Sequence, residues 1–227
     1  LGGVRRWALG DVEIRGKYRY LDGTRLRGSV AALVRLPTGA IDHPENYLDL
    51  SPADRQMDFE VRLINEWTPT GGVVLHGALR AGWQLPQTLV RRVTPPWAPL
   101  AEAGFEAEVR RDPGDYLEVF FAPMIELAPG FTAGLGGRYR RRAPDRHTYA
   151  SAADSTLVFQ RTGMAVSAAV LDVETWERDY RVVAGMTYTT PGVQASFSYE
   201  VSFYGGGGAT PFARRFLLGL RTSRGLF

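Results

Sequence analysis

The chain has 227 residues, with 27 basic and 24 acidic side chains, a formal net charge of +3 and no cysteine. This length allows one large domain with a real core, and a hydrophobic content of 44% excludes wholesale disorder. The lack of cysteine excludes a disulfide scaffold, a thiolate metal site and a cysteine nucleophile. No apolar run approaches the roughly 20 residues of a membrane helix. The mild charge, with acids and bases interleaved, argues against nucleic acid as a partner.

The chain alternates apolar and polar residues with a period of two almost everywhere, which is typical of strands. In the first segment Val12, Ile14 and Tyr18 share one face, and Glu13 and Arg15 share the other. The pattern predicts strands at about 11–21, 25–36, 57–67, 73–84, 115–127, 131–142, 174–189, 193–204 and 212–227. Residues 143–173 are the least defined, because 157–171 fits either a short helix or a stray strand.

Pro123 lies inside the fifth predicted strand. Proline has no N–H to donate to a strand ladder, so we expect a bulge or a local break there. The glycine run 205–208 has neither the lysine nor the following helix of a phosphate-binding loop, and we expect it to be a flexible hairpin connector.

The connections between these strands differ systematically in length. Short turns at 22–24, 68–72, 128–130 and 190–192 alternate with longer segments at 37–56, 85–114, 143–173 and 205–211. All short turns should therefore lie at one end of the sheet, as in outer-membrane barrels. Strands of this length also match the roughly 9–11 residues that a tilted membrane strand needs.

Alternation alone does not say which face is internal, because a soluble β-sandwich buries its apolar face and a membrane barrel exposes it. Three features favour the barrel: glycine and alanine on the apolar face, both signs of charge on the polar face, and aromatic residues near strand ends. The predicted aromatic girdle comprises Tyr18, Tyr20, Trp67, Trp83, Tyr139, Trp176, Tyr188 and Phe203.

The polar face supplies the main candidate functional residues, because rings of charge inside a pore filter solutes by sign. The same charges are equally consistent with a network that plugs a narrow barrel. The predicted lumen-facing residues are Arg15, Lys17, Arg19, Arg25, Arg27, Arg35, Glu60, Arg62, Glu66, His76, Arg80, Glu118, Glu126, Arg138, Arg140, Glu177, Asp179, Arg181 and Glu200.

A short motif adds a family resemblance. The segment Gly10-Asp11-Val12-Glu13-Ile14, followed by Lys17-Tyr18-Arg19, resembles a strand of bacterial outer-membrane transporters of the FadL-like and meta-pathway phenol-degradation type. The segment Arg111–Leu117 and the terminal Phe227 fit the same resemblance. It implies uptake of a small hydrophobic or aromatic solute, and assembly of the barrel through its C-terminal strand.

Two features bear on completeness. Phe216, Leu218 and Leu220 have the opposite parity to Phe227, which a bulge near Gly225 would correct. Bacterial barrels have an even number of strands. We therefore expect residues 1–227 to form one domain, an all-β antiparallel up-and-down transmembrane barrel with nine visible strands of 10 or 12, whose first strand or strands and signal peptide lie upstream.

Other residues offer weaker hypotheses. His76 with Asp58, Glu60, Glu66 or Ser29 is conceivable as the site of a hydrolase embedded in the barrel, but the pattern favours an ordinary hydrogen-bonded lumen residue. Acids around His43 in the first long segment suggest calcium, or a solvated loop. The basic run Arg138, Arg140, Arg141, Arg142 and Arg146 suggests contact with lipopolysaccharide phosphates, or an ordinary solvated rim.

The sequence thus predicts a channel in the bacterial outer membrane for passive uptake of a small solute, without catalysis, metal or cofactor. Its expected partners are outer-membrane lipid, lipopolysaccharide and the barrel-assembly machinery, the last through the strand ending at Phe227. The alternatives are a structural or adhesive barrel without transport, an enzyme using His76, and a soluble β-sandwich binding module.

Overall fold

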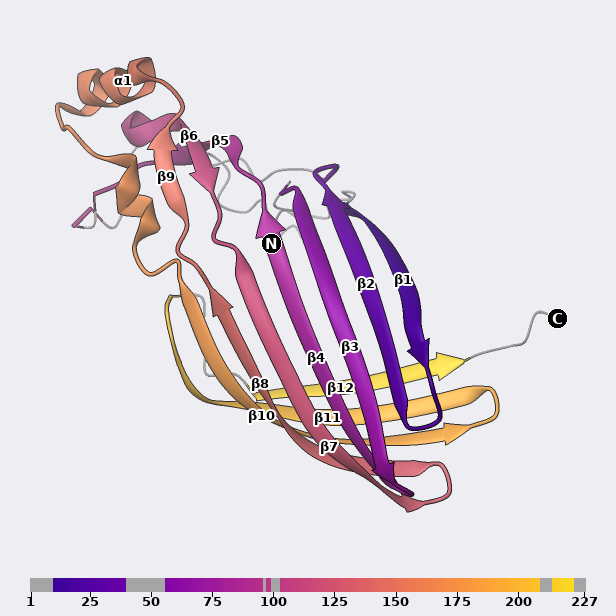
Figure 1. The fold of residues 1–227 in the computed structure, drawn as a ribbon. Coiled ribbons are helices and arrows are strands. Elements are labelled where there is room, and N and C mark those ends of the chain that lie inside the picture. Colours follow the sequence, from indigo (N-terminus) through magenta and orange to yellow (C-terminus); the bar gives the residue numbers. More distant parts are fainter. Residues whose placement is uncertain (1–9, 40–55, 96, 99–102, 209–213, 223–227) are drawn as a thin grey trace, which may run out of the picture.

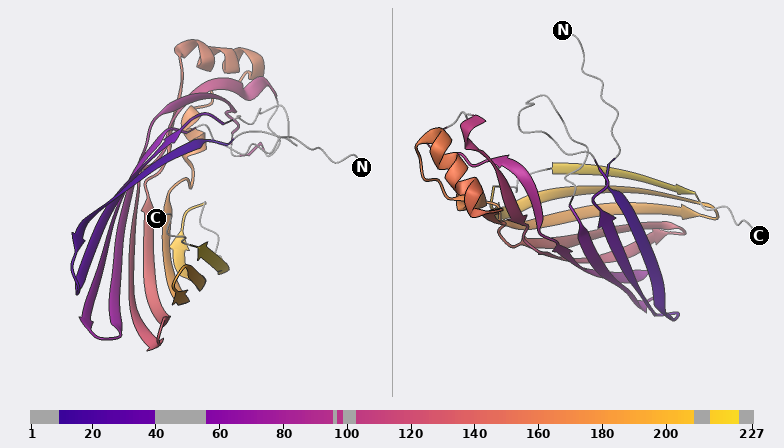
Figure 2. Two further views of the ribbon diagram at one scale, coloured as in Figure 1. Left: turned by 90° about the vertical axis from the view of Figure 1, so that its right-hand side faces the viewer. Right: turned by 90° about the horizontal axis from the view of Figure 1, so that it is seen from above.

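The computed structural model describes residues 10–39, 56–95, 97–98, 103–208 and 214–222. Nine long strands form a single antiparallel sheet in which each strand pairs with its neighbours in the order β1-β2-β3-β4-β7-β8-β10-β11-β12 (Figure 1). These strands are β1 (Val12–Asp22), β2 (Leu26–Leu36), β3 (Asp58–Thr70), β4 (Val73–Gln84), β7 (Tyr116–Ala128), β8 (Phe131–Arg142), β10 (Glu177–Thr190), β11 (Val193–Gly206) and β12 (Arg214–Thr222). The sheet is strongly curved (Figure 2).

The nine predicted strands and their up-and-down order are confirmed, with ends that differ by a few residues. At Pro123 the ladder between β7 and β8 is interrupted: Phe121 pairs with Gly137 and Met124 with Gly134, without a shift of register. The feature is therefore a break and not a bulge, and pairing with β4 continues through it. Phe227 and the predicted bulge near Gly225 lie outside the described residues.

The polarity of the sheet is the reverse of a soluble domain. Val119 is 40% exposed and Phe121 52% exposed, whereas Glu60 is 5%, Asp179 2% and Glu200 1% exposed. We call the side that carries Val119 and its cross-strand neighbours the apolar face, and the side that carries Glu60 the charged face. The interior of the curve is thus charged, which excludes the soluble sandwich with a salt-bridged outer surface.

Two shifts of strand register occur close to aromatic residues at strand ends. The β1–β2 register shifts between Arg19 and Leu21, and the β10–β11 register shifts between Tyr180 and Arg181. Because side chains alternate between the two faces, one extra residue at such a shift changes the face to which the residues beyond it point. Tyr20 packs over Gly28 and is hydrogen-bonded to Asn65, in the row of the apolar face that contains Phe121.

The two ends of the sheet differ as the connection lengths predict. The turns β1–β2, β3–β4, β7–β8 and β10–β11 lie at one end, and the longer connections lie at the other (Figure 1). Two of the longer segments, 85–114 and 143–173, are not simple loops, however. They contain a second antiparallel sheet of β5 (Gln87–Arg92), β6 (Glu106–Asp112) and β9 (Arg146–Tyr149), the helix α1 (Ala152–Thr162), and the 3-10 turns η1 (Ala103–Phe105) and η2 (Ala168–Asp172).

The helix α1 begins and ends with clear local signals. Ser151 and Asp154 form a reciprocal capping box at its start, and Gly163 ends it with a left-handed φ of 71°. The expectation of one element over 157–171 is therefore wrong in position, because these caps place the helix earlier and a separate 3-10 turn later in the segment. None of the helices in the described residues is long and apolar enough to cross a membrane.

The small sheet and helix have their own apolar core. Val93 and Val109 pack with Ala168, and Phe105 packs with Val158. Tyr149 contacts both clusters and donates a hydrogen bond of 2.8 Å to the Val166 carbonyl. Burial, together with the nearby Asp154 carboxylate, raises the pKa of Tyr149, so its hydroxyl stays protonated as a donor over a wide pH range.

Asp145 joins this small unit to the main sheet. Its carboxylate, on a side chain only 4% exposed, lies 2.8 Å from the Arg111 guanidinium of β6 and 2.6 Å from that of Arg142 in β8. It also accepts the Gly114 N–H at 3.1 Å. One carboxylate therefore fixes the points where β6 leads into β7 and β8 leads into β9.

Because the apolar face is exposed, we predict that arginine substitutions at two neighbouring residues of β10 have very different effects on stability. Met186 lies on the apolar face and Thr187 on the charged face. We expect Met186→Arg to destabilise the protein in a lipid bilayer by about 2 kcal/mol, because a lipid-facing charge is costly. Thr187→Arg, the matched control, should cost much less. Unfolding by denaturant in lipid vesicles measures both, and equal effects would contradict this orientation.

Candidate functional site

The charged face gathers the candidate residues into rows across the strands. Arg62, Arg80, Glu118, Arg140 and Asp179 are successive cross-strand partners from β3 to β10. The next row runs from Arg19 through Ile64, Phe120 and Arg138 to Arg181. All the predicted lumen-facing residues that lie within strands occupy this face, and Arg25 lies in the β1–β2 turn, where its carbonyl accepts the Thr68 N–H. Whether they meet a permeating solute stays a prediction.

Glu60 is the most highly connected carboxylate of this face. Its oxygens lie 2.5 Å from the Arg80 guanidinium and 3.0 Å from that of Arg62. Tyr116 donates a further hydrogen bond of 2.6 Å to it. A carboxylate so nearly buried needs such partners, since an unpaired buried charge costs several kcal/mol. Glu60 therefore fixes two arginines and a tyrosine from three different strands.

The ion pairs continue across the sheet as a ladder. Glu118 lies 3.8 Å from both Arg80 and Arg138. Arg138 in turn lies 3.0 Å from Glu200, and Arg181 lies 3.6 Å from the same carboxylate. The ladder links β3, β4, β7, β8, β11 and β10, and it ends where the Arg181 guanidinium donates to Asp179. Two smaller groups flank it: Arg35 bridges Glu13 and Asp58, and Arg140 lies 3.5 Å from Glu177.

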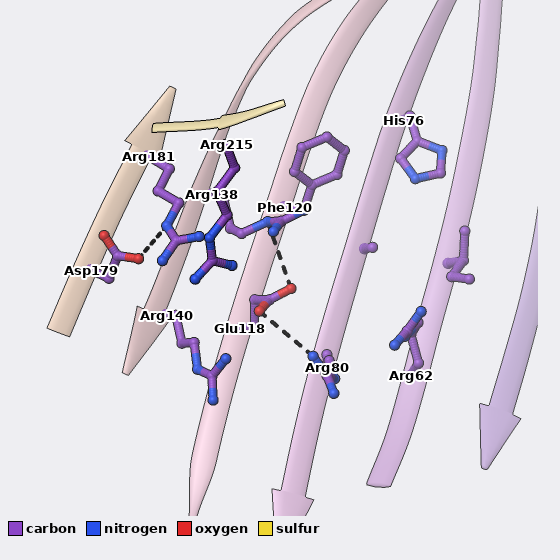
Figure 3. A pocket seen from close by; sticks show the side chains of 12 residues that line it. Arg62, His76, Arg80, Glu118, Phe120, Arg138, Arg140, Asp179, Arg181 and Arg215 are labelled. Atoms are coloured by element: carbon purple, nitrogen blue, oxygen red, sulfur yellow. Dashed lines mark hydrogen bonds and ion pairs between the residues drawn. The ribbon is translucent and has the colours of Figure 1, made fainter. Parts of the chain in front are cut away.

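A cavity of about 430 Å³ lies along this ladder, between β3 and β12 (Figure 3). Six strands contribute to its lining, which requires the sheet to curve around it. The lining residues are Arg62, Ile64, His76, Ala78, Arg80, Glu118, Phe120, Arg138, Arg140, Asp179, Arg181 and Arg215. In Figure 3 Arg138, Arg140 and Arg181 group on one side of Glu118, and Arg80 and Arg62 lie on the other.

Several arginines of this cavity have hydrogen-bonding capacity to spare. The buried Nε atoms of Arg80, Arg138 and Arg140 have no hydrogen-bond partner. The same side chains stack near aromatic rings: Arg80 and Arg140 lie 5.1 and 5.2 Å from the Tyr116 ring centre, and Arg138 lies 5.7 Å from that of Phe120. The rings therefore help to hold the guanidiniums in place beside the cavity.

His76 has a structural environment on this face. Its Nδ1 lies 3.2 Å from the Glu66 carboxylate, and its ring meets Phe120 edge-on at 5.7 Å. In the part of the chain that the structure describes, no hydroxyl is hydrogen-bonded to this histidine, and Ser29 lies in the row of Ile64 instead. Nor do the described residues contain a cluster of three or more His, Cys, Asp or Glu side chains that would hold a metal ion.

The basic run does not form one surface, contrary to the hypothesis of a single lipopolysaccharide-binding patch. Arg138, Arg140 and Arg142 turn to the charged face, where acids bind them, because alternate strand residues point to opposite sides. Arg141 alone of the β8 arginines lies on the apolar face, opposite Arg178. Arg146 belongs to β9.

The glycine run is also less of a connector than expected. Gly205 and Gly206 extend β11, and Trp176 packs over Gly206 so closely that an added Cβ would lie 2.6 Å from the indole ring. Gly207 has a φ of +97°. These glycines therefore allow close packing of Trp176 rather than flexibility. The acidic cluster around His43 lies outside the described residues.

The predicted aromatic girdle is divided between the two ends of the apolar face. Trp83 lies towards the end with the long connections, Trp67 and Tyr188 lie towards the turns, and Tyr18 lies in the middle part of β1, nearer its turn. Tyr139 packs against Tyr180 with ring centres 4.7 Å apart, and Tyr180 contacts Phe203. Tyr18, Trp67, Tyr188 and Phe203 are all more than half exposed.

Some residues of the site are not among the predicted ones. Tyr116, Phe120 and Arg142 have the parity of Glu118 and Arg140, so extending the alternation by a residue or two identifies them. To identify Arg215 one needs the register of β12 against β11, which places it opposite Glu200. Asp145 carries no sequence signal, because its partners Arg111 and Arg142 are brought to it by two separate sheets.

The comparisons with known proteins fit this architecture. No family model and no curated protein matches the chain. Among solved structures, the crystal structure of an outer membrane channel from Pseudomonas putida F1 is similar, with a TM-score of 0.62 at 11% sequence identity. The match covers 94% of this chain and 66% of that one. The chain therefore has the antiparallel up-and-down fold of an outer-membrane β-barrel channel.

We predict that the ladder of ion pairs contributes to the stability of the folded protein. We expect Glu60→Gln to destabilise the protein by about 3 kcal/mol, because it leaves the Arg62 and Arg80 guanidiniums without their shared carboxylate. Glu66→Gln is the control, since its side chain is 38% exposed and, among the described residues, forms an ion pair only with His76, and it should cost well under 1 kcal/mol. Denaturant unfolding in detergent compares the two. Equal costs would show that the ladder does not hold the sheet together.

Proposed function

We propose that the chain forms most of the wall of a channel in the bacterial outer membrane, and that small solutes pass through its charged interior by diffusion. The reversed polarity of the sheet carries this proposal: carboxylates with under 10% exposure lie inside, and apolar side chains around half exposed lie outside. In water that arrangement exposes a large apolar surface at a high cost. Lipid outside and water inside remove that cost.

The comparison with the Pseudomonas putida outer membrane channel supports the same function at the level of architecture. The resemblance of residues 10–19 to transporters of the FadL-like and phenol-degradation type supports a finer one, a hydrophobic or aromatic solute. The cavity of about 430 Å³ supports an open interior over a plugged one, because the ladder leaves space on the concave side of the sheet.

The sheet edges bear on how the barrel closes. Among the described residues β1 pairs only with β2, and β12 pairs only with β11. Unpaired N–H and C=O groups are not tolerated in the hydrocarbon of a bilayer. We therefore propose that further strands complete the wall between β1 and β12, consistent with a match to only 66% of the similar channel. We propose that β12 is the strand through which the assembly machinery recognises the barrel.

Cell fractionation and heat-modifiability test the location and the closure, with the chain expressed in its native full-length form. We expect the protein in the outer-membrane fraction, and an unheated band on a gel that migrates differently from the boiled one. A soluble protein that needs no detergent would contradict the membrane proposal. The variant Met186→Arg should reduce the folded band, and Thr187→Arg should not.

Conductance in a planar bilayer then separates a channel from a structural or adhesive barrel. We expect discrete single-channel steps from the purified, heat-modifiable protein. A folded protein that never conducts would support a barrel without transport.

A further inference from the structure

The lining of the cavity between β3 and β12 is strongly unequal in charge. Arginine provides six of its side chains and acids only two, Glu118 and Asp179. The carboxylates that balance the arginines lie mostly behind them: Glu60 and Glu200 pair with arginines of the cavity but do not line it. A solute in the cavity therefore meets guanidinium groups first.

Further bases on this face lie outside the network of ion pairs. Lys17, Arg27 and Arg215 form no ion pair with any residue that the structure describes. Lys17 and Arg27 line a second cavity of about 140 Å³ with Arg19 and Glu66, and Ile64 borders both cavities. The positive lining thus continues from β12 to β1, along most of the curved sheet.

One part of the cavity is apolar. Ile64, Ala78 and Phe120 are successive neighbours in one row across β3, β4 and β7, and Arg138 follows them in the same row. An apolar strip therefore ends directly beside the Arg138 guanidinium. Figure 3 shows the Phe120 ring between His76 and the group of Arg138, Arg181 and Arg215.

The arginines also have the geometry to bind an anion. The side chains of Arg80, Arg138 and Arg140 line the cavity and are 28%, 27% and 34% exposed, and a guanidinium binds a carboxylate through two parallel N–H bonds. Glu118, at 3.8 Å from two guanidiniums, is too far for strong hydrogen bonds to either, so it does not saturate them.

We propose that the channel favours anions and that the cavity accepts a small organic carboxylate. Its charge meets the guanidiniums of Arg138, Arg140 and Arg215, and its apolar body lies against Ile64, Ala78 and Phe120. This inference rests on the proposed channel function and specifies the class of solute.

The reversal potential across a potassium chloride gradient, measured in a planar bilayer, tests the sign of selectivity. We expect chloride to permeate in preference to potassium. Lys17→Gln, Arg27→Gln and Arg215→Gln each remove a charge without leaving an acid unpaired. Each should lower the chloride-to-potassium permeability ratio about 2-fold, as expected for a charge several ångströms from a hydrated path.

Arg141→Gln and Arg178→Gln are the matched controls, because they make the same change on the opposite face of the sheet. They should leave the permeability ratio unchanged. If the channel conducts without preferring anions, or if the controls act as strongly as the test variants, the inference is wrong and the channel function stands. If the folded protein never conducts, the proposed function itself fails.

Benzoate and acetate, added separately to the chloride solution, test the apolar strip. We expect benzoate to reduce the chloride current at a lower concentration than acetate. Phe120→Ala should raise the benzoate concentration needed by about 5-fold or more, as loss of an aromatic contact implies. Phe121→Ala, the neighbour on the apolar face, should not. Equal block by both acids, or equal effects of both variants, would overturn the assignment of an apolar-bodied carboxylate.

Discussion

Pairing between carboxylates and guanidiniums inside the curved sheet is the interaction on which the rest of the structure depends. In the main sheet β3, β4, β7, β8, β10 and β11 turn charged side chains inward, and Glu60, Glu118 and Glu200 each join two arginines that lie on different strands. An isolated charge in such a position would favour the unfolded chain. Because each acid contacts bases on different strands, the same pairs that neutralise the interior also fix the relative positions of the strands.

The ladder links stability to the proposed transport in an unusual way. Arg80, Arg138 and Arg181 pair with acids of the sheet, and the same three arginines line the cavity. Acids at the wall hold the arginines, and the guanidiniums border the cavity. One set of side chains therefore stabilises the wall and defines the electrostatic character of the space beside it.

Much of the main sheet could be predicted because it depends on patterns within single strands and on short turns between consecutive strands. Alternation in β1 or β11 states which residues share a face, and the short turns state which strands are neighbours. The small sheet of β5, β6 and β9 was not predictable, because its segments are short and rich in proline and arginine, and its core of Val93, Val109 and Ala168 forms only between distant segments. The register shifts near Tyr20 and Tyr180 likewise depend on packing across strands. Within the site, Arg215 and Asp145 could not be predicted either, because their positions depend on contacts between distant segments.

The break in the ladder at Pro123 has a consequence for how the wall is assembled. Closing a hairpin at its turn costs the least chain entropy, so β7 and β8 zip from the turn at Gly130 towards the opposite end. The gap opposite Leu135 and Gly136 interrupts that process part of the way along. Strand β4 pairs with β7 straight past the proline, so the β4–β7 ladder is continuous where the β7–β8 ladder is broken. The order in which strands join thus matters more here than in a hairpin that is continuous from end to end.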